Sequence, residues 1–208
     1  MITAEELTSI PKDALQEFSK NLSESDISQL VDWLSLKDDN VRYPSFLLLQ
    51  SRSLFSKDLY PYWDVFYEKL SSENSYQRSI GLMLIADNVQ WDTENKLQNT
   101  MDSYLKLLYD EKPITVRQCI QSLQKIVTYQ PNYNPRVISS LISFDLSQVK
   151  DTMRKSILLD ILNVLLSVRK SDRTNEAEAY ILSALSGEIL DKKTKKQIES
   201  QMLEHPNE

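Results

Sequence analysis

The sequence predicts an all-α protein in which about five helical hairpins stack into an α-α superhelix, a solenoid. The first observation is an arginine that recurs at the start of amphipathic stretches, at Arg42, Arg78, Arg117 and Arg154. These arginines are 36, 39 and 37 residues apart, a period typical of stacked helical repeats. The second observation is that glycine occurs only twice, so the tight turns that β-hairpins need are largely missing. We therefore expect residues 1–208 to form a single repeat domain.

Residues 1–22 are expected to form an N-terminal cap of one or two helices. Thr3 and Glu6 have the spacing of a capping box, in which each side chain bonds to the other residue's backbone N–H. A second helix is predicted after Pro11, where apolar residues recur at helical spacing.

The first hairpin is predicted at about residues 23–55. Ser23 and Asp26 repeat the capping signal and open its first helix. Its second helix is predicted to begin at about Pro44, because proline is disfavoured inside a helix. That start would leave Arg42 just before the helix.

Four further hairpins follow the same pattern. They are predicted at about residues 58–89, 93–130, 134–170 and 175–204. The second helix of the third hairpin is expected to run from Pro113 to Tyr129, because proline is favoured at a helix start. The fourth hairpin ends with a long helix that closes near Arg169 and carries two adjacent apolar stripes. A face that wide implies packing on more than one neighbour.

The composition excludes several classes of enzyme. The chain has neither a glycine-rich dinucleotide fingerprint nor a P-loop. Its one cysteine, Cys119, falls on an apolar helical face, and its one histidine, His205, belongs to the last few residues. A catalytic triad or a histidine metal site cannot be built from this set. We therefore expect a protein that is not an enzyme, with no catalytic residue, cofactor or metal.

The charge distribution and the first residues bear on partners and location. The net charge is −6, which opposes a phosphate backbone, so nucleic acid is not the expected partner. The first ten residues lack the basic start and apolar stretch of a secretory signal. No apolar run approaches the length of a membrane span, so no membrane contact is expected. The simplest expectation is a cytoplasmic protein.

The chain resembles the HEAT/ARM-like repeat families. Paired helices of this period with a turn of the form DxxVR, as in residues 38–42, are similar to HEAT repeats, and the resemblance covers roughly residues 23–203. The segments WDTENKLQ (91–98) and DEKPITVRQCIQSLQ (110–124) resemble small bacterial HEAT-like proteins of unknown function, some labelled "SufBD". That label would imply iron–sulfur cluster assembly, but the assembly scaffolds resemble a β-helix, and this sequence predicts no β-structure.

The resemblance implies an internal ladder, in which a turn aspartate and a helix-start arginine bond to each other in neighbouring repeats. Carried over, it makes the four arginines structural rather than ligand-binding. The ladder residues are Arg42, Arg78, Arg117, Arg154, Asp38 and Asp151, with Asp39 as an alternative to Asp38. The second repeat offers Glu73 or Asn74 as the partner of its arginine, and the third offers Asp110 or Glu111, displaced by an insertion.

We expect a protein-binding or scaffold role, since stacked hairpins present an extended surface without a deep catalytic pocket. The resemblance implies that the second helices line the concave face and that an unidentified protein or peptide binds there. The candidate contact residues are Tyr43, Ser79, Gln118, Gln121, Lys125 and Lys155.

A DNA-binding protein or an alkyl-base DNA glycosylase is the alternative. HEAT-like glycosylases resemble this chain in size and in carrying a tryptophan near an aspartate. Here such pairs occur as Trp63-Asp64 and Trp91-Asp92. The acidic net charge weighs against this alternative.

Overall fold

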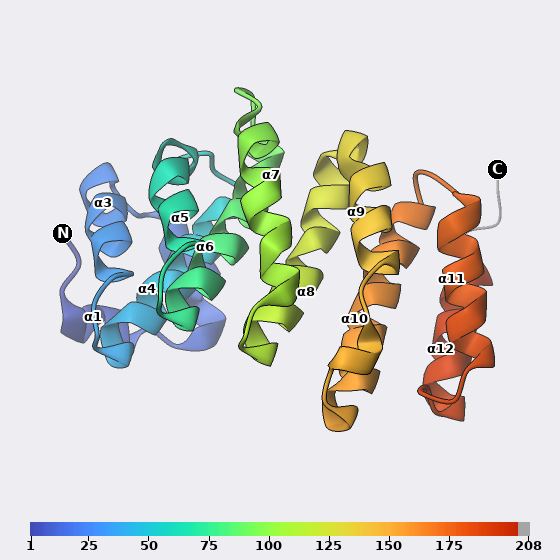
Figure 1. Cartoon of the computed structure of the whole chain (residues 1–208). Helices are drawn as coiled ribbons and strands as arrows, with labels where there is room; N and C mark the ends of the chain where they lie inside the picture. The colour runs from blue at the N-terminus through green and yellow to red at the C-terminus, as the bar shows by residue number, and fades with distance from the viewer. Residues whose placement is uncertain (204–208) are drawn as a thin grey trace. The chain divides into compact units, whose positions relative to one another are not determined.

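The computed structural model describes residues 1–203, and within that range it contains α-helices and short 3₁₀-helices but no β-strand (Figure 1). The prediction of an all-α chain is confirmed for these residues. His205 lies outside them. The chain divides into two compact units, Met1–Tyr104 and Leu105–Glu208, called unit 1 and unit 2 below.

Unit 1 contains α-helices and short 3₁₀-helices. They are α1 (Ala4–Ser9), η1 (Lys12–Ala14), α2 (Leu15–Lys20), α3 (Glu24–Trp33), α4 (Asp39–Ser53), η2 (Tyr60–Tyr62), α5 (Trp63–Lys69), α6 (Ser75–Asn88), η3 (Val89–Trp91) and α7 (Lys96–Lys106), whose last two residues belong to unit 2. Helix α4 contacts α1, α2, α3 and α6, so the N-terminal cap and the first hairpin share one core. Leu48 and Leu49 of α4 are fully buried there.

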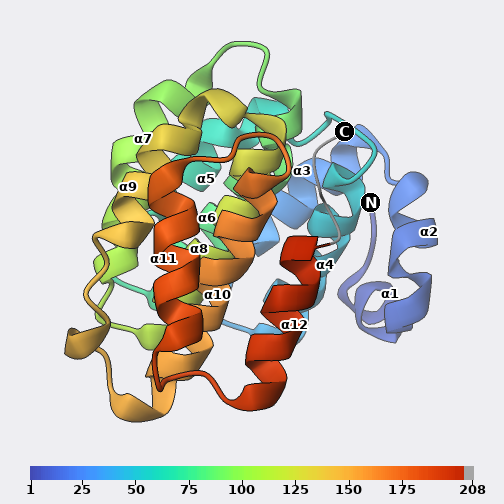
Figure 2. The ribbon, with the colours of Figure 1, turned by 90° about the vertical axis from the view of Figure 1, so that its right-hand side faces the viewer.

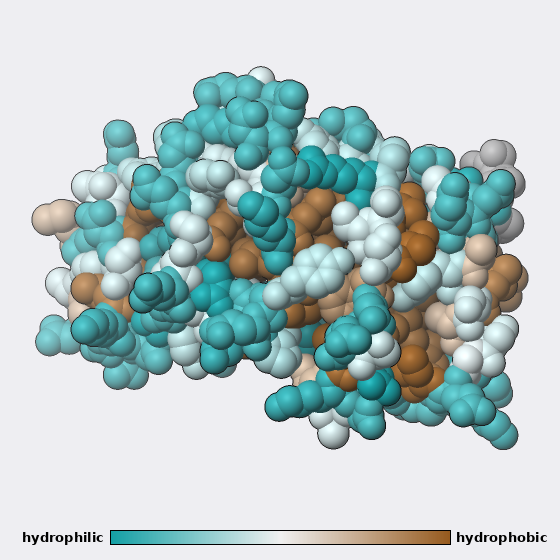
Figure 3. Space-filling view, viewed as in Figure 1, coloured by the Kyte–Doolittle hydropathy of each residue, from teal (hydrophilic) through white to brown (hydrophobic). Residues whose placement is uncertain are grey.

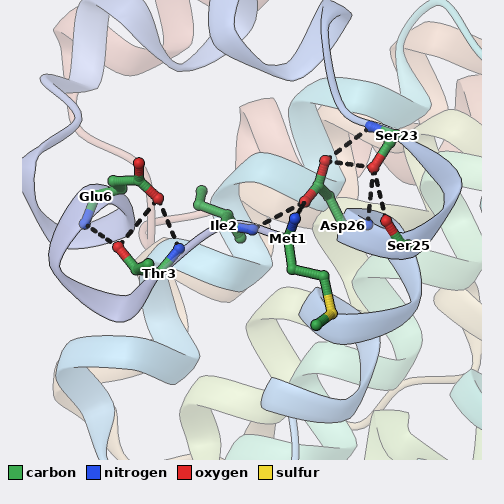
Figure 4. A network of polar contacts seen from close by, with 7 residues as sticks. All are labelled: Met1, Ile2, Thr3, Glu6, Ser23, Ser25 and Asp26. Atoms are coloured by element: carbon green, nitrogen blue, oxygen red, sulfur yellow. Dashed lines mark hydrogen bonds and ion pairs between the residues drawn. The ribbon is translucent and has the colours of Figure 1, made fainter.

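Both predicted capping boxes are present at the N-terminus (Figure 4). Thr3 and Glu6 close the first turn of α1, and Ser23 and Asp26 close the first turn of α3. Asp26 also accepts the backbone N–H of Ile2 at 2.9 Å, and the Met1 amino nitrogen lies 3.4 Å from the same carboxylate oxygen. One carboxylate therefore caps α3 and holds the segment before α1 against it.

The contact between Ile2 and Asp26 is expected to be lost in acid. Hydrogen bonds from Ser23 are the main reason that the pKa of Asp26 lies below its ordinary value of 3.8. A depressed pKa contributes stability that is present above the unfolded pKa and disappears as the pH falls through the folded one. The NMR shift of the Ile2 amide should therefore titrate below pH 3.8. In Asp26→Asn the amide should show no such titration; an unchanged titration in that variant would assign the effect to another group.

The second helix of the first hairpin begins earlier than predicted. Helix α4 starts at Asp39, so Arg42 lies inside it and Pro44 is its sixth residue. The Asp38 side chain accepts from the backbone N–H of Asn40 and caps the helix before the proline is reached. Since the helix has already begun, Pro44 removes one hydrogen bond within it instead of determining its start.

A buried lysine joins the first two hairpins of unit 1. Lys69, at the end of α5, is buried and donates to Ser35 Oγ at 2.9 Å and to Gln77 Oε1 at 2.6 Å. Gln77 in turn donates to the Leu34 carbonyl at 2.7 Å. Burial lowers the pKa of Lys69, since the charged form loses water. This network fixes α5 and α6 against the end of α3.

Within its described residues, unit 2 contains five whole α-helices and three short 3₁₀-helices. Its elements are η4 (Leu107–Tyr109), α8 (Pro113–Tyr129), η5 (Pro131–Tyr133), α9 (Asn134–Ile142), η6 (Leu146–Gln148), α10 (Asp151–Arg169), α11 (Asn175–Ser186) and α12 (Lys192–Leu203). Helices α9 and α11 lie on one side, and α8, α10 and α12 lie on the other (Figure 2). The predicted bounds of α8 and the predicted end of α10 are confirmed.

Helix α10 is the centre of unit 2. It contacts α8, α9, α11 and α12, as its two apolar stripes predicted. At its end, the Arg169 guanidinium donates to Glu178 at 2.5 Å and to the Met202 carbonyl at 2.9 Å, which ties α10 to α11 and α12. No helix within residues 1–203 is both long enough and apolar enough to cross a bilayer.

Candidate interaction site

Three of the four recurring arginines, Arg42, Arg78 and Arg154, donate hydrogen bonds to the turn that precedes their own helix. Arg42 donates to the Leu36 carbonyl at 3.0 Å and pairs with Asp39 rather than with Asp38. Arg78 donates to the carbonyls of Ser72 and Glu73. These bonds join each guanidinium to the turn before its own helix. The guanidinium carbon of Arg42 also lies 5.4 Å from the ring centroid of Tyr76 in the next hairpin.

Arg154 follows the same pattern in unit 2. It donates to the carbonyls of Leu146 and Val149, each at 3.0 Å, and pairs with Asp151 at 2.8 Å. Asp151 is thus an acidic partner as predicted, although it belongs to the same helix.

Arg117 forms an ion pair with a carboxylate of another hairpin. Its Nε donates to Asp160 Oδ2 at 2.6 Å, and its Nη2 donates to Asp160 Oδ1 at 3.1 Å. Gln121 adds a third donor to the same carboxylate at 2.9 Å. The Asp160 side chain is only 7% exposed, against 29% for Arg117. This network links α8 to α10 through a carboxylate that no sequence pattern had indicated.

The candidate contact residues of unit 1 have opposite environments. Tyr43 is 53% exposed on α4, whereas Ser79 is 6% exposed on α6. The expectation that Ser79 projects from the surface is therefore wrong. Helix α6 packs on both α4 and α5, and the Tyr104 hydroxyl also donates to its Leu82 carbonyl, so little of the helix faces solvent.

The candidate contact residues of unit 2 reach the surface to different degrees. Gln121 and Lys155 are exposed. Gln121 donates a hydrogen bond to Asp160 of α10, and Lys155 forms an ion pair with Asp191, the residue before α12. Lys125 and Gln118 are half-buried, and among the described residues the side-chain oxygen of Gln118 has no hydrogen-bond partner. We call the surface carrying these four residues the second-helix face.

The residues of the glycosylase alternative have structural contacts. Trp63 is buried and donates to Thr100 Oγ1 at 2.9 Å, and Trp91 donates to the Ser53 carbonyl at 3.0 Å. Asp64 is exposed on α5.

Asp92 caps the start of α7. It accepts the Tyr60 hydroxyl at 2.7 Å and the backbone N–H groups of Lys96 and Leu97. Burial and the bond to Asp92 raise the pKa of Tyr60. Both carboxylate oxygens of Asp92 are therefore already used by the fold.

Unit 2 also has a surface pocket that the sequence patterns did not predict. It lies between the start of α8 and the start of α10, and its volume is about 350 Å³. We call this cavity the α8–α10 pocket. It is lined by Leu108, Tyr109, Asp110, Glu111, Pro113, Val116, Phe144, Asp145, Gln148, Val149, Lys150, Met153 and Ile157. Two turn segments and two helix starts meet there. No local pattern predicts that meeting, although the apolar residues beside the polar turn at 110–112 were a usable signal.

The α8–α10 pocket has an apolar interior and a charged rim. Among its apolar residues, Val116, Phe144 and Ile157 are buried. Tyr109 stacks on Phe144, with ring centroids 6.0 Å apart, yet remains 67% exposed. Hydrogen bonds from Ser147 lower the pKa of Asp145 on the rim, so this carboxylate is ionised at neutral pH.

The face of the molecule that Figure 3 displays is mixed in character. On this face, apolar surface forms separate patches between hydrophilic side chains.

Among the described residues, no group of three or more histidine, cysteine, aspartate or glutamate side chains has the arrangement of a metal site. Cys119 is fully buried, and burial raises the pKa of its thiol.

Comparisons with known proteins leave the family open. No family model matches the chain, and no curated protein or solved structure matches it.

Proposed function

We propose that the chain is a non-enzymatic protein-binding or scaffold protein of HEAT-like repeats, and that a partner protein docks at the α8–α10 pocket. The single observation that carries the proposal is the pairing of an apolar interior with a charged rim at the surface of unit 2. Protein interfaces have this anatomy, in which a dry apolar centre is surrounded by polar groups.

The chemistry of the described side chains supports a binding role over catalysis. The buried thiol of Cys119 has a raised pKa, which disfavours the thiolate that a nucleophile requires. Asp92 holds α7 and Tyr60, and Asp160 holds Arg117 and Gln121. These hydrogen bonds stabilise the fold. Either carboxylate would have to give them up in order to react with a substrate.

Site-specific photo-crosslinking in the native cell tests this function. A photoreactive amino acid at Gln148, which is exposed on the rim, should form a covalent adduct with a partner protein. The same group at Lys125 probes the second-helix face, and at Ala179, exposed on α11, it serves as the control. Adducts should be identified by mass spectrometry.

The three positions separate the possible outcomes. A protein adduct from position 148 and none from 179 supports docking at the pocket. An adduct from 125 alone would keep the protein-binding role and move the site to the second-helix face. Protein adducts from neither 148 nor 125 would contradict the proposed function.

A further inference from the structure

We infer that the first two turns of α12 bind an acidic segment of a partner protein through three exposed lysines. These are Lys192, Lys193 and Lys196, called the lysine cluster below. None of the three lines the α8–α10 pocket. The inference therefore goes beyond the proposed function, and either one can fail while the other stands.

The lysine cluster has a defined place in unit 2. Helix α12 packs on α10 at the edge of the unit (Figure 2). At one end of α12, Lys155 of α10 pairs with Asp191, the residue before the helix. At the other end, the Met202 carbonyl accepts from Arg169, which also holds Glu178 of α11. The lysine cluster thus lies beside the start of α10, and the acidic start of α11 lies at the opposite end of α12.

The three ammonium groups of the cluster have no hydrogen bond or ion pair with any described residue. The polar groups next to them are already used. Asp191 is held by Lys155 and accepts the backbone N–H of Thr194, and these bonds keep its pKa well below its usual range. Lys195 donates to the Gly187 carbonyl at 2.7 Å. The cluster is therefore open to an anionic partner, whereas the backbone at the helix start is already capped.

The charge around the cluster stays positive when the neighbouring acids are counted. Glu188 and Glu199 are exposed, and counting both against the cluster and Lys195 leaves a net charge of +2. The charges at the start of α10 cancel one another: they are Asp145, Lys150, Asp151, Arg154 and Lys155, the last with its partner Asp191. An acidic segment would complement this excess of positive charge.

The lysines occupy positions at which they weaken their own helix. Positive charge is unfavourable at a helix N-terminus, where the macrodipole favours anions. Four lysines nevertheless stand among the first five residues of α12, and its first turn contains no acid. Lys192 and Lys196 are also four residues apart, a spacing at which like charges repel each other. Departures from such local rules are expected at functional sites.

The spacing of the cluster suits a short acidic stretch in an extended conformation. Lys192 and Lys196 are separated by about 6 Å along the helix axis, because each helical residue advances about 1.5 Å. In an extended segment, residues two apart point to the same side and are about 7 Å apart. Two acids with one residue between them can therefore face these two lysines, with Lys193 beside them.

An acidic protein segment is favoured over nucleic acid. Duplex DNA carries one phosphate charge per roughly 1.7 Å and continues well beyond a patch of this length. Outside the cluster it would meet a chain whose net charge is −6. The same net charge opposes the approach of a second copy. A short acidic segment of another protein, in contrast, can contact the cluster alone.

Selection from a library of short random peptides displayed on phage tests the inference, with the full chain as target at low ionic strength. The library is first depleted against a triple variant with Lys192→Glu, Lys193→Glu and Lys196→Glu, which removes peptides that bind other surfaces. We expect the remaining peptides to share two aspartates or glutamates separated by one residue. Recovery of no peptide, or of peptides without an excess of acids, would overturn the inference.

Binding of the most enriched peptide should then be measured by fluorescence anisotropy. Lys193→Glu should weaken binding about fivefold, whereas Lys193→Arg, which keeps the charge, should change it less than about twofold. Lys170→Glu, at an exposed lysine just after α10, is the matched control and should leave binding unchanged. Equal losses from Lys193→Glu and Lys170→Glu would show that total charge is recognised rather than the cluster, and would overturn the inference.

The charge reversals should leave the fold intact. Acids in the first turn of α12 complement the helix dipole, so the triple variant should melt at or above the temperature of the parent. Circular dichroism should confirm the helix content and the melting temperature. If the triple variant fails to fold, depletion against Lys193→Glu alone replaces it and the same outcomes apply.

The remaining outcomes distinguish this inference from the proposed function. If position 148 crosslinks to a protein but no acidic peptide is selected, the inference fails and the function stands. If acidic peptides are selected but positions 148 and 125 give no adduct, the inference stands and the proposed function fails. An oligothymidylate that binds as tightly as the peptide would make nucleic acid the occupant and overturn the inference. Self-association that the triple variant abolishes would make a second copy the occupant and overturn it as well.

Discussion

Replacing Arg117 with alanine is expected to lower the free energy of unfolding by about 3–5 kcal/mol, the range for breaking a buried ion pair. The variant removes two of the three donors that hold the Asp160 carboxylate. Asp160 cannot turn to solvent, because its side chain is only 7% exposed in the middle of α10. A poorly compensated carboxylate in a protein interior is costly, so most of the loss arises from Asp160. Denaturant unfolding monitored by circular dichroism measures the change.

Two controls identify the mechanism. Adding Asp160→Asn to Arg117→Ala should recover part of the lost stability, because a neutral amide is cheaper to bury than a carboxylate. Arg154→Ala should cost about 1 kcal/mol or less, since Arg154 is more exposed and its partner Asp151 is solvated. Equal effects of the two arginine substitutions would show that the Asp160 contact has no special weight.

Gly81→Ala is expected to destabilise the protein by about 1–3 kcal/mol, the cost of overpacking a close contact. Alanine has the higher helix propensity by about 1 kcal/mol, so an isolated α6 would be strengthened by the change. In unit 1, however, a Cβ at this position would lie 2.6 Å from the Phe66 carbonyl oxygen and 2.9 Å from Lys69 Cβ. Relief of the first contact requires α5 to move away from α6, because it involves backbone. Thermal unfolding measures the net effect.

The second glycine of the chain is the matched control. A Cβ at Gly187 would meet its nearest neighbour, the Ser183 carbonyl oxygen, at 3.5 Å, an ordinary contact distance. Its backbone φ of −73° suits alanine, so Gly187→Ala should change stability by less than about 0.5 kcal/mol. A Gly81→Ala protein at least as stable as the parent would show that α5 and α6 are not in close contact.

Much of the helical architecture could be predicted from the sequence, because the signals that begin and end helices are local. Thr3 with Glu6 and Ser23 with Asp26 form their capping boxes within a single turn. Pro113 begins α8 because its missing N–H costs nothing at a helix start. The same reasoning failed at Pro44, where a cap formed by Asp38 had already begun the helix. Which of two competing local signals prevails was not evident from residue types.

The sequence by itself thus determined that the described chain is helical, where most of its helices lie and which faces are apolar. Only the tertiary structure decided that Ser79 is buried, that Arg117 bonds to Asp160 and that Tyr109 stacks on Phe144 beside a pocket. Arg117 and Asp160 are 43 residues apart, and their meeting depends on the rotation and offset of α8 against α10. Those quantities arise from the sum of many small packing contacts between helices, and no short stretch of sequence contains them.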